Sequence, residues 1–172
     1  LVDGDQLMYV VARDRQAHGE LKGPVVGTVM SNLGLEHALK AEGIAFLRAA
    51  VGDRYVLAML RENGGVLGGE TSGHLLCLDR TTTGDGLVSA LQVLAAMKQT
   101  GRPLAELTAG MARFPQVMVN VRVKERIDPA RSPAIQAAVQ RVEALPGDAG
   151  RGVLRASGRE PLIRAMVEGR DE

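Results

Sequence analysis

Aromatic residues are scarce in this chain of 172 residues, which has two Tyr, two Phe and no Trp. Proteins that bind single-stranded nucleic acids stack bases on aromatic side chains, and this chain offers almost none. The formal net charge is only +1, and charges of both signs are mixed along the chain rather than gathered in blocks. We therefore predict neither a nucleic-acid partner nor a membrane-binding patch.

Long apolar runs and paired cysteines are also absent. No stretch approaches the roughly 18–20 apolar residues of a transmembrane helix, and the start does not have the pattern of a signal peptide. The single cysteine, Cys77, cannot form an internal disulfide, which suits a reducing compartment. We therefore expect a soluble, cytoplasmic protein. Because the chain opens on Leu1 and ends just after an apolar strand-like stretch, we also expect it to be a piece of a longer protein.

The first two thirds of the chain alternate predicted helices with predicted strands. Apolar residues recur at helical spacing over residues 6–16, 33–42, 54–62 and 87–100, and short apolar runs predict strands at 25–30, 45–49, 66–68 and 75–78. We expect the N-cap residues to be Asp5, Asp53 and Thr83. In helix 87–100 the spacing places Leu87, Leu91 and Leu94 on one apolar face. This alternation is typical of an α/β layered sheet with mostly parallel pairing.

The pattern changes after Phe114 and Pro115. Valines at every second position over 117–123 alternate with Met118, Asn120 and Arg122, which predicts a strand with one polar-leaning face. A helix with an apolar stripe at Ile135, Val139, Val142 and Leu145 follows, and then strands at 152–156 and 162–167. We therefore predict an α/β layered sheet domain over residues 1–113 and a smaller α+β domain over 114–172.

Residues 68–74, Gly-Gly-Glu-Thr-Ser-Gly-His, are the first candidate binding segment. Their three glycines allow tight turns and a close approach of the backbone to a ligand. Glu70, Ser72 and His74 offer a carboxylate, a hydroxyl and an imidazole, a set that suits several sugar hydroxyls. The alternative is a glycine-rich hairpin in which Glu70 and His74 are surface groups.

Residues 155–164 are the second candidate binding segment. Arg155 and Ser157 point the same way in an extended chain, and Gly158 lets the following turn expose backbone N–H groups to an anion. Arginine side chains, here including Arg164, grip phosphate oxygens in bidentate fashion. The alternative is a basic strand turn whose arginines pair with Glu160 and Glu168.

The remaining polar segments predict structure rather than chemistry. Residues 79–86, Asp-Arg-Thr-Thr-Thr-Gly-Asp-Gly, read mainly as the start of a helix. Asp3-Gly4-Asp5 resembles a carboxylate metal loop but lacks a third acidic residue, so we interpret it as a turn and a cap. Cys77 lies in an apolar strand and is interpreted as a buried small side chain. No metal-ligand spacing and no Ser-His-Asp arrangement emerges.

Six segments in this order resemble the phosphoglucosamine mutases of the α-D-phosphohexomutase superfamily. They are VDGDQLMYV (2–10), GTVMSNLGLE (27–36), VGDRYV (51–56), GGETSGH (68–74), DRTTTGDG (79–86) and RASGREPLIR (155–164). Proteins of this family have four domains, which carry in turn a phosphorylated serine, an aspartate-rich Mg²⁺ loop, a sugar-binding loop and a phosphate-binding loop. The resemblance implies that this chain is the third domain (1–113) and most of the fourth (114–172), truncated before its last helix.

The resemblance also implies an activity and a set of site residues. The parent enzyme would interconvert glucosamine 6-phosphate and glucosamine 1-phosphate through a phosphoserine and a bisphosphate, on the way to peptidoglycan precursors. This chain would lack the catalytic serine and the Mg²⁺ ligands and be inactive alone. Substrate would be bound by Glu70, Ser72, His74 and Arg54, and phosphate by Arg155, Ser157, Gly158, Arg159 and Arg164. Arg159 departs from the family, which usually has Thr there.

Two alternatives stay open at this point. One is a sister activity, that of a phosphomannomutase or phosphoglucomutase, although Thr71 and the TTTGDG segment favour the aminosugar enzyme. The other is a phosphosugar-binding module without a catalytic partner. In each case the expected ligand is a small phosphosugar.

Overall fold

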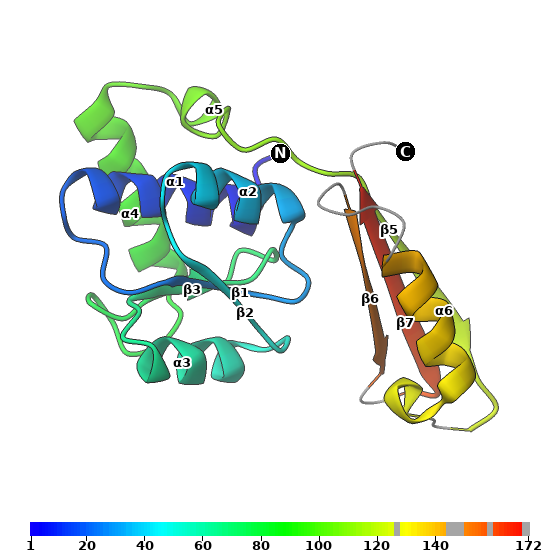
Figure 1. The fold of residues 1–172 in the computed structure, drawn as a ribbon. Helices are drawn as coiled ribbons and strands as arrows, with labels where there is room; N and C mark the ends of the chain where they lie inside the picture. The colour runs from blue at the N-terminus through cyan, green and yellow to red at the C-terminus, as the bar shows by residue number, and fades with distance from the viewer. Residues whose placement is uncertain (126–127, 144–149, 158–159, 170–172) are drawn as a thin grey trace. The chain divides into compact units, whose positions relative to one another are not determined.

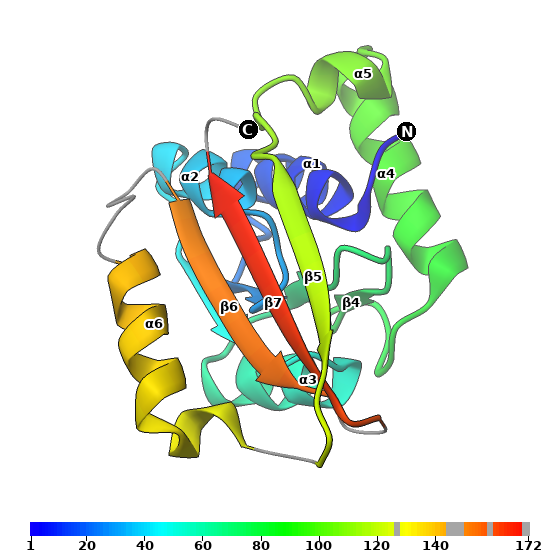
Figure 2. The same ribbon diagram turned by 90° about the vertical axis from the view of Figure 1, so that its right-hand side faces the viewer.

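The computed structural model describes residues 1–125, 128–143, 150–157 and 160–169, drawn as a ribbon in Figures 1 and 2. The chain forms two compact units, Leu1–Arg113 and Phe114–Glu172, which we call the first and second units. None of the helices in the described ranges combines the length and hydrophobicity needed to cross a bilayer.

The first unit is a three-layer α/β/α sandwich, in which α3 lies on one side of the sheet and α1 and α2 lie on the other (Figure 1). Its helices are α1 (Gly4–Ala17), α2 (Leu33–Ala41), α3 (Asp53–Glu62), α4 (Gly86–Thr100) and the short α5 (Leu104–Leu107). Its strands are β1 (Val25–Thr28), β2 (Phe46–Ala49), β3 (Leu67–Gly69) and β4 (Leu75–Cys77), in the order β2-β1-β3-β4. β1 pairs in parallel with β2 and β3, and β4 pairs antiparallel with β3, so the predicted α/β sheet is confirmed as a mixed one.

Each face of this sheet carries its own aliphatic core. Successive residues of a strand point to opposite faces, so Val25 packs with α1, α2 and α4 while Val26 packs against α3. On the α3 side, Val56 and Leu60 are fully buried against the strands. Burying one such side chain stabilises the fold by about 1.5–3 kcal/mol, which compensates for the lack of aromatic residues.

The helix caps differ from those expected. Asp3, not Asp5, caps α1, because Gln6 stands three residues later and completes a capping box: Gln6 N donates to Asp3 Oδ1 (3.0 Å) and Asp3 N to Gln6 Oε1 (3.2 Å). Asp85 caps α4 in place of Thr83, since its carboxylate accepts from the N–H groups of the first turn. At α3, Asp53 is the first helical residue and follows a glycine cap without a side-chain hydrogen bond.

The apolar face of α4 that the sequence emphasises is turned away from the core. Leu87, Leu91 and Leu94 are 79, 61 and 56% exposed. The buried side carries Ser89, Val93 and Ala96 instead. This face of small and β-branched side chains packs against α1, so hydrophobicity alone does not decide which face is buried.

The second unit is a three-stranded antiparallel sheet with one longer helix, as predicted. It consists of β5 (Gln116–Arg122), the 3₁₀ turn η1 (Pro129–Arg131), α6 (Pro133–Glu143), β6 (Gly150–Ala156) and β7 (Leu162–Gly169), with sheet order β5-β7-β6. α6 contacts the edge strand β6 (Figure 2). Of the predicted apolar stripe, Leu145 lies outside the described residues.

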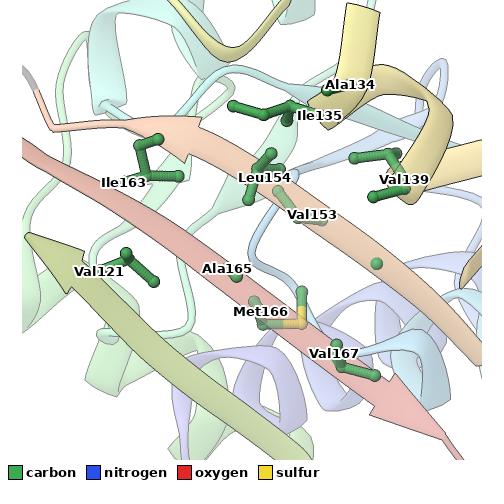
Figure 3. A pocket seen from close by; sticks show the side chains of 12 residues that line it. Val121, Ala134, Ile135, Val139, Val153, Leu154, Ile163, Ala165, Met166 and Val167 are labelled. Atoms are coloured by element: carbon green, nitrogen blue, oxygen red, sulfur yellow. The ribbon is translucent and has the colours of Figure 1, made fainter. Parts of the chain in front are cut away.

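The pleat divides this sheet into an apolar and a polar face. One face carries Val117, Val119 and Val121 of β5 with their partners on β7 and β6, and an apolar cavity of about 440 Å³ lies between it and α6 (Figure 3). The three valines are each about half exposed or more. The opposite face carries the polar residues of the same strands, including the arginines of the second candidate segment.

Candidate functional site

Residues 70–74, which we call the Glu70 turn, connect β3 to β4 as a tight hairpin. Gly73 N donates to Glu70 O (2.9 Å), and Glu70 N donates to His74 O (3.1 Å). Gly73 has a φ of +95°, a backbone conformation that favours glycine. Ser72 is exposed at the tip of the turn.

The carboxylate of Glu70 sits at the start of α3. Its Oε1 accepts a hydrogen bond from Gly52 N (3.0 Å), so Glu70 supplies the acceptor that the glycine cap lacks. Gly52 has a φ of 125°, so a side chain here would strain the backbone. The N-terminal end of a helix is a favourable place for an acidic side chain such as Glu70.

Arg54 lies in the first turn of α3, on the same helix end that Glu70 contacts. Its side chain is exposed and lies over the ring of Tyr55, with 4.5 Å between the guanidinium carbon and the ring centre. Arg54 Nη2 also donates to the Tyr55 hydroxyl. The structure thus brings Arg54 and Glu70 to one place, although they are 16 positions apart in the sequence.

His74 lies close to residues of two other segments, 51–56 and 79–86. Its Nε2 lies 3.6 Å from Asp53 Oδ2, and both side chains are exposed. A Cβ added to Gly84 would lie 2.2 Å from the same nitrogen. Segment 79–86, predicted mainly as a helix start, therefore also touches this histidine. The sequence signals were a glycine within a polar run and the place of this segment among the six that resemble the family.

The first turn of α1 lies directly under the Glu70 turn. Gly4 N donates to Thr71 O (2.9 Å), and Thr71 Oγ1 donates to Asp5 Oδ2 (2.8 Å). Asp3, the cap residue, also pairs with Arg113 Nε (3.2 Å). Each carboxylate therefore has partners within the protein, while Asp5 Oδ1 accepts no hydrogen bond among the described residues. Across the described ranges, no group of three or more His, Cys, Asp or Glu side chains is placed to hold a metal ion.

In the second unit, two arginines of the second candidate segment lie directly opposite each other. Arg155 on β6 pairs in register with Arg164 on β7, and Asn120 on β5 flanks Arg164 on the other side. Like charges in such a cross-strand pair destabilise a sheet. The Nε atoms of both arginines are buried and make no hydrogen bond within the described residues. This pair therefore forms a concentrated positive site with unused donors.

The turn after β6 is only partly described. Ser157 N donates to Leu162 O (2.8 Å), and Glu160 N donates to Ser157 Oγ (3.4 Å), so Ser157 lies at the mouth of the turn two residues from Arg155. Gly158 and Arg159, which were also predicted to bind phosphate, lie outside the described residues. Glu168 pairs with Arg151 at 2.7 Å.

Comparison with known proteins identifies the chain's relatives. Residues 3–114 match the model described as phosphoglucomutase/phosphomannomutase, alpha/beta/alpha domain III, and residues 118–172 match the C-terminal domain of the same family. The chain belongs to the phosphoglucomutase/phosphomannomutase family. The phosphoglucosamine mutases of Methylococcus capsulatus and Alkalilimnicola ehrlichii are 60% and 58% identical to the whole chain. The chain spans 38% of the length of each.

Solved structures of the α-D-phosphohexomutase superfamily share the fold. A substrate complex of an N-acetylglucosamine-phosphate mutase superposes with a TM-score of 0.84 at 19% identity, over 99% of this chain and 41% of that one. The N-acetylphosphoglucosamine mutase of Aspergillus fumigatus, in complex with GlcNAc-6P and magnesium, gives 0.81 at 20% identity, over 99% of this chain and 44% of that one. In this family member, the Glu70 turn belongs to domain III and the Arg155–Arg164 pair to the C-terminal domain.

Proposed function

We propose that this chain is the substrate-recognition portion of a phosphoglucosamine mutase. The parent protein would interconvert glucosamine 6-phosphate and glucosamine 1-phosphate. The observation that carries the proposal is the Arg155–Arg164 pair. Its two positive charges face each other and its Nε donors are unused, so the pair favours a bound anion. The high identity to phosphoglucosamine mutases over the whole chain supports the aminosugar as substrate.

The Glu70 turn would bind the sugar ring. Only Oε1 of Glu70 is used by Gly52 N, which leaves Oε2 as an acceptor for a ring hydroxyl or an ammonium group. Ser72 and His74 are exposed beside it and add a hydroxyl and a switchable ring nitrogen. Arg54, on the same helix end, adds a cation near the place where a phosphosugar would lie.

The second unit would bind the phosphate that is not reacting. Two guanidinium groups side by side offer parallel N–H donors, which match phosphate oxygens far better than ammonium groups do. Asn120 and Ser157 would add to this site, and the resemblance to the family's phosphate loop adds Gly158 and Arg159. A bound dianion would also remove the repulsion between Arg155 and Arg164, so binding and local stability would increase together.

The reaction explains why both grips are needed. A phosphoserine of the parent would transfer its phosphoryl group to one end of the sugar, which gives a bisphosphate. After the bisphosphate reverses its orientation, the phosphoryl group at the other end would return to the serine. Both orientations of the intermediate must bind the same enzyme. The serine, and any Mg²⁺ ligands, would come from parts of the parent outside this chain.

Substrate competition in the full-length parent tests the proposal. We expect the highest kcat/KM with glucosamine 6-phosphate, lower values with glucose and mannose 6-phosphates, and loss of affinity in Glu70→Gln and Arg164→Ala. A clear preference for glucose or mannose phosphate would instead assign the sister activity of the same family. Binding of phosphosugars without any turnover would support a non-catalytic module.

A further inference from the structure

A buried carboxylate lies beneath the Glu70 turn and takes no part in the proposed chemistry. Asp5, in the first turn of α1, is fully buried. Its Oδ2 accepts hydrogen bonds from Asn32 N and from Thr71 Oγ1, both at 2.8 Å. Burial raises the pKa of Asp5, although the hydrogen bonds from Asn32 and Thr71 act in the opposite direction. A buried carboxylate costs stability unless it is paired or fully hydrogen-bonded, and Asp5 Oδ1 has no hydrogen-bond partner among the described residues.

Thr71 is held by α1 at two points. Its backbone carbonyl accepts from Gly4 N (2.9 Å), and its hydroxyl donates to Asp5. The fit is close enough that a Cβ on Gly4 would lie 2.1 Å from Glu70 O and 2.6 Å from Gly73 N. The backbone of the Glu70 turn therefore rests directly on the start of α1.

The residues on either side of Thr71 are those that would touch the sugar. Glu70 precedes Thr71 and Ser72 follows it, so a rotation of the Thr71 peptide groups would move both side chains. Hydrogen bonds to a charged group are roughly twice as strong as neutral ones, so an ionised Asp5 restrains this rotation better than an amide would.

We propose that Asp5 is a positioning residue that acts through Thr71: its carboxylate fixes the Glu70 turn in the conformation that presents Glu70 and Ser72 to the sugar. The same carboxylate oxygen binds Asn32 N, so the turn is anchored to the β1–α2 connection as well as to α1. This inference rests on the proposed function of the turn. Asp5 itself touches no substrate in this scheme.

The test compares variants of the full-length parent. Asp5→Asn and Thr71→Val each remove the charge-assisted hydrogen bond, and we expect each to raise KM for glucosamine 6-phosphate by about tenfold with a smaller change in kcat. Thr71→Ser keeps the hydroxyl and is expected to stay within about twofold of wild type. Because both changes break the Thr71–Asp5 hydrogen bond, the double variant Asp5→Asn/Thr71→Val is expected to be no worse than Asp5→Asn alone.

Asp14→Asn is the matched control. Asp14 lies on the same helix, and burial raises the pKa of its carboxyl too, but its neighbour is His18 at the far end of α1. We expect this variant to leave KM unchanged. Asp5→Asn is expected to unfold at no lower urea concentration than Asp14→Asn, which separates positioning from general loss of structure. If Asp5→Asn does not fold, the Thr71→Val and Thr71→Ser pair decides.

The outcomes separate this inference from the proposed function. If Glu70→Gln raises KM while Asp5→Asn and Thr71→Val do not, the positioning role is wrong and the sugar-binding role of the turn stands. Additive effects of Asp5→Asn and Thr71→Val would also overturn it. If wild type turns over no phosphosugar, or if Glu70→Gln has no effect on KM, the proposed function fails instead.

Discussion

The opposed arginines of the second unit lead to an unusual prediction, that losing one of them stabilises the empty protein. Replacing Arg164 with Ala removes the like charge facing Arg155, and a charged cross-strand pair changes stability by about 0.2–1 kcal/mol. We therefore expect Arg164→Ala to equal or exceed the wild-type unfolding free energy when no anion is present. The lost side-chain packing partly offsets this gain.

The same substitution should remove much of the affinity for phosphate. A hydrogen bond to a charged group contributes about 1.5–3 kcal/mol, which corresponds to a loss of roughly 10- to 150-fold in binding. The assay is thermal unfolding of the parent protein over a series of inorganic phosphate and glucosamine 6-phosphate concentrations. Wild type is expected to melt at higher temperature as phosphate rises, and Arg164→Ala to respond much less.

Arg151→Ala is the control for this experiment, because Arg151 is also a strand β6 arginine on the polar face. It pairs with the buried Glu168 at 2.7 Å, and Gln116 donates to the same carboxylate oxygen at 3.0 Å. Breaking such a pair costs about 3 kcal/mol, so Arg151→Ala should melt earlier but keep its response to phosphate. If Arg164→Ala destabilises the empty protein as much as Arg151→Ala and both respond equally to phosphate, the anion-site reasoning is refuted.

Three further predictions follow from the first unit. Gly84→Ala places a Cβ against the His74 ring and should raise KM for the sugar phosphate several-fold, whereas Gly86→Ala, with open space around it, should not; steady-state kinetics of the parent compares them. Burial, and to a lesser extent Asp3, raises the pKa of Asp5 in the folded state above its ordinary value of 3.8. The contribution of Asp5 to stability should therefore be lost as the pH rises from about 3.8 through the folded-state pKa. Urea unfolding from pH 4 to 8 should show a smaller loss of stability in Asp5→Asn than in wild type. Leu91→Gln on the exposed face of α4 should change the unfolding free energy of this chain by no more than about 0.5 kcal/mol, while Val93→Ala in the core should cost about 2 kcal/mol, and equal losses would contradict the observed orientation of α4.

The elements of the fold could be predicted from the sequence because they depend on local patterns. Alternating valines predicted β5, and helical spacing predicted α1 to α4 to within a few residues. The cap of α1 was also readable, since Asp3 and Gln6 have capping-box spacing, but the neighbouring Asp5 drew the prediction away from it.

The orientation of α4 could not be predicted from the spacing of its apolar residues alone. Its sequence has apolar residues on two sides, the leucine face and a side of small and β-branched residues that includes Ala96 and Val93. Hydrophobicity alone favours the leucines. Which face of α4 is buried depends on its packing against α1, and the sequence of one helix does not determine this tertiary contact.

The candidate site was predicted in part for the same reason. Glu70, Ser72 and His74 lie within one short motif, and composition marked it as a binding segment. Their supports are distant in sequence: Gly52 reaches Glu70, Asp5 reaches Thr71 and Gly84 reaches His74. Each support is a separate loop or helix end that only the folded sheet brings to the turn.

These supports explain why the turn needs glycines around it as well as within it. At Gly4 and Gly84 an added Cβ would collide with the turn, and Gly52 needs a backbone conformation that side chains disfavour. The contacts of Gly4, Gly52 and Gly84 leave the turn little conformational freedom. The conformational entropy that the turn loses when a sugar binds is therefore small. A ligand that needed the turn to move would have to break the contacts to α1 or α3. We therefore expect sugar specificity to follow from the fixed shape of the turn, and changes beneath it, at Asp5 or Thr71, to alter specificity without touching the sugar.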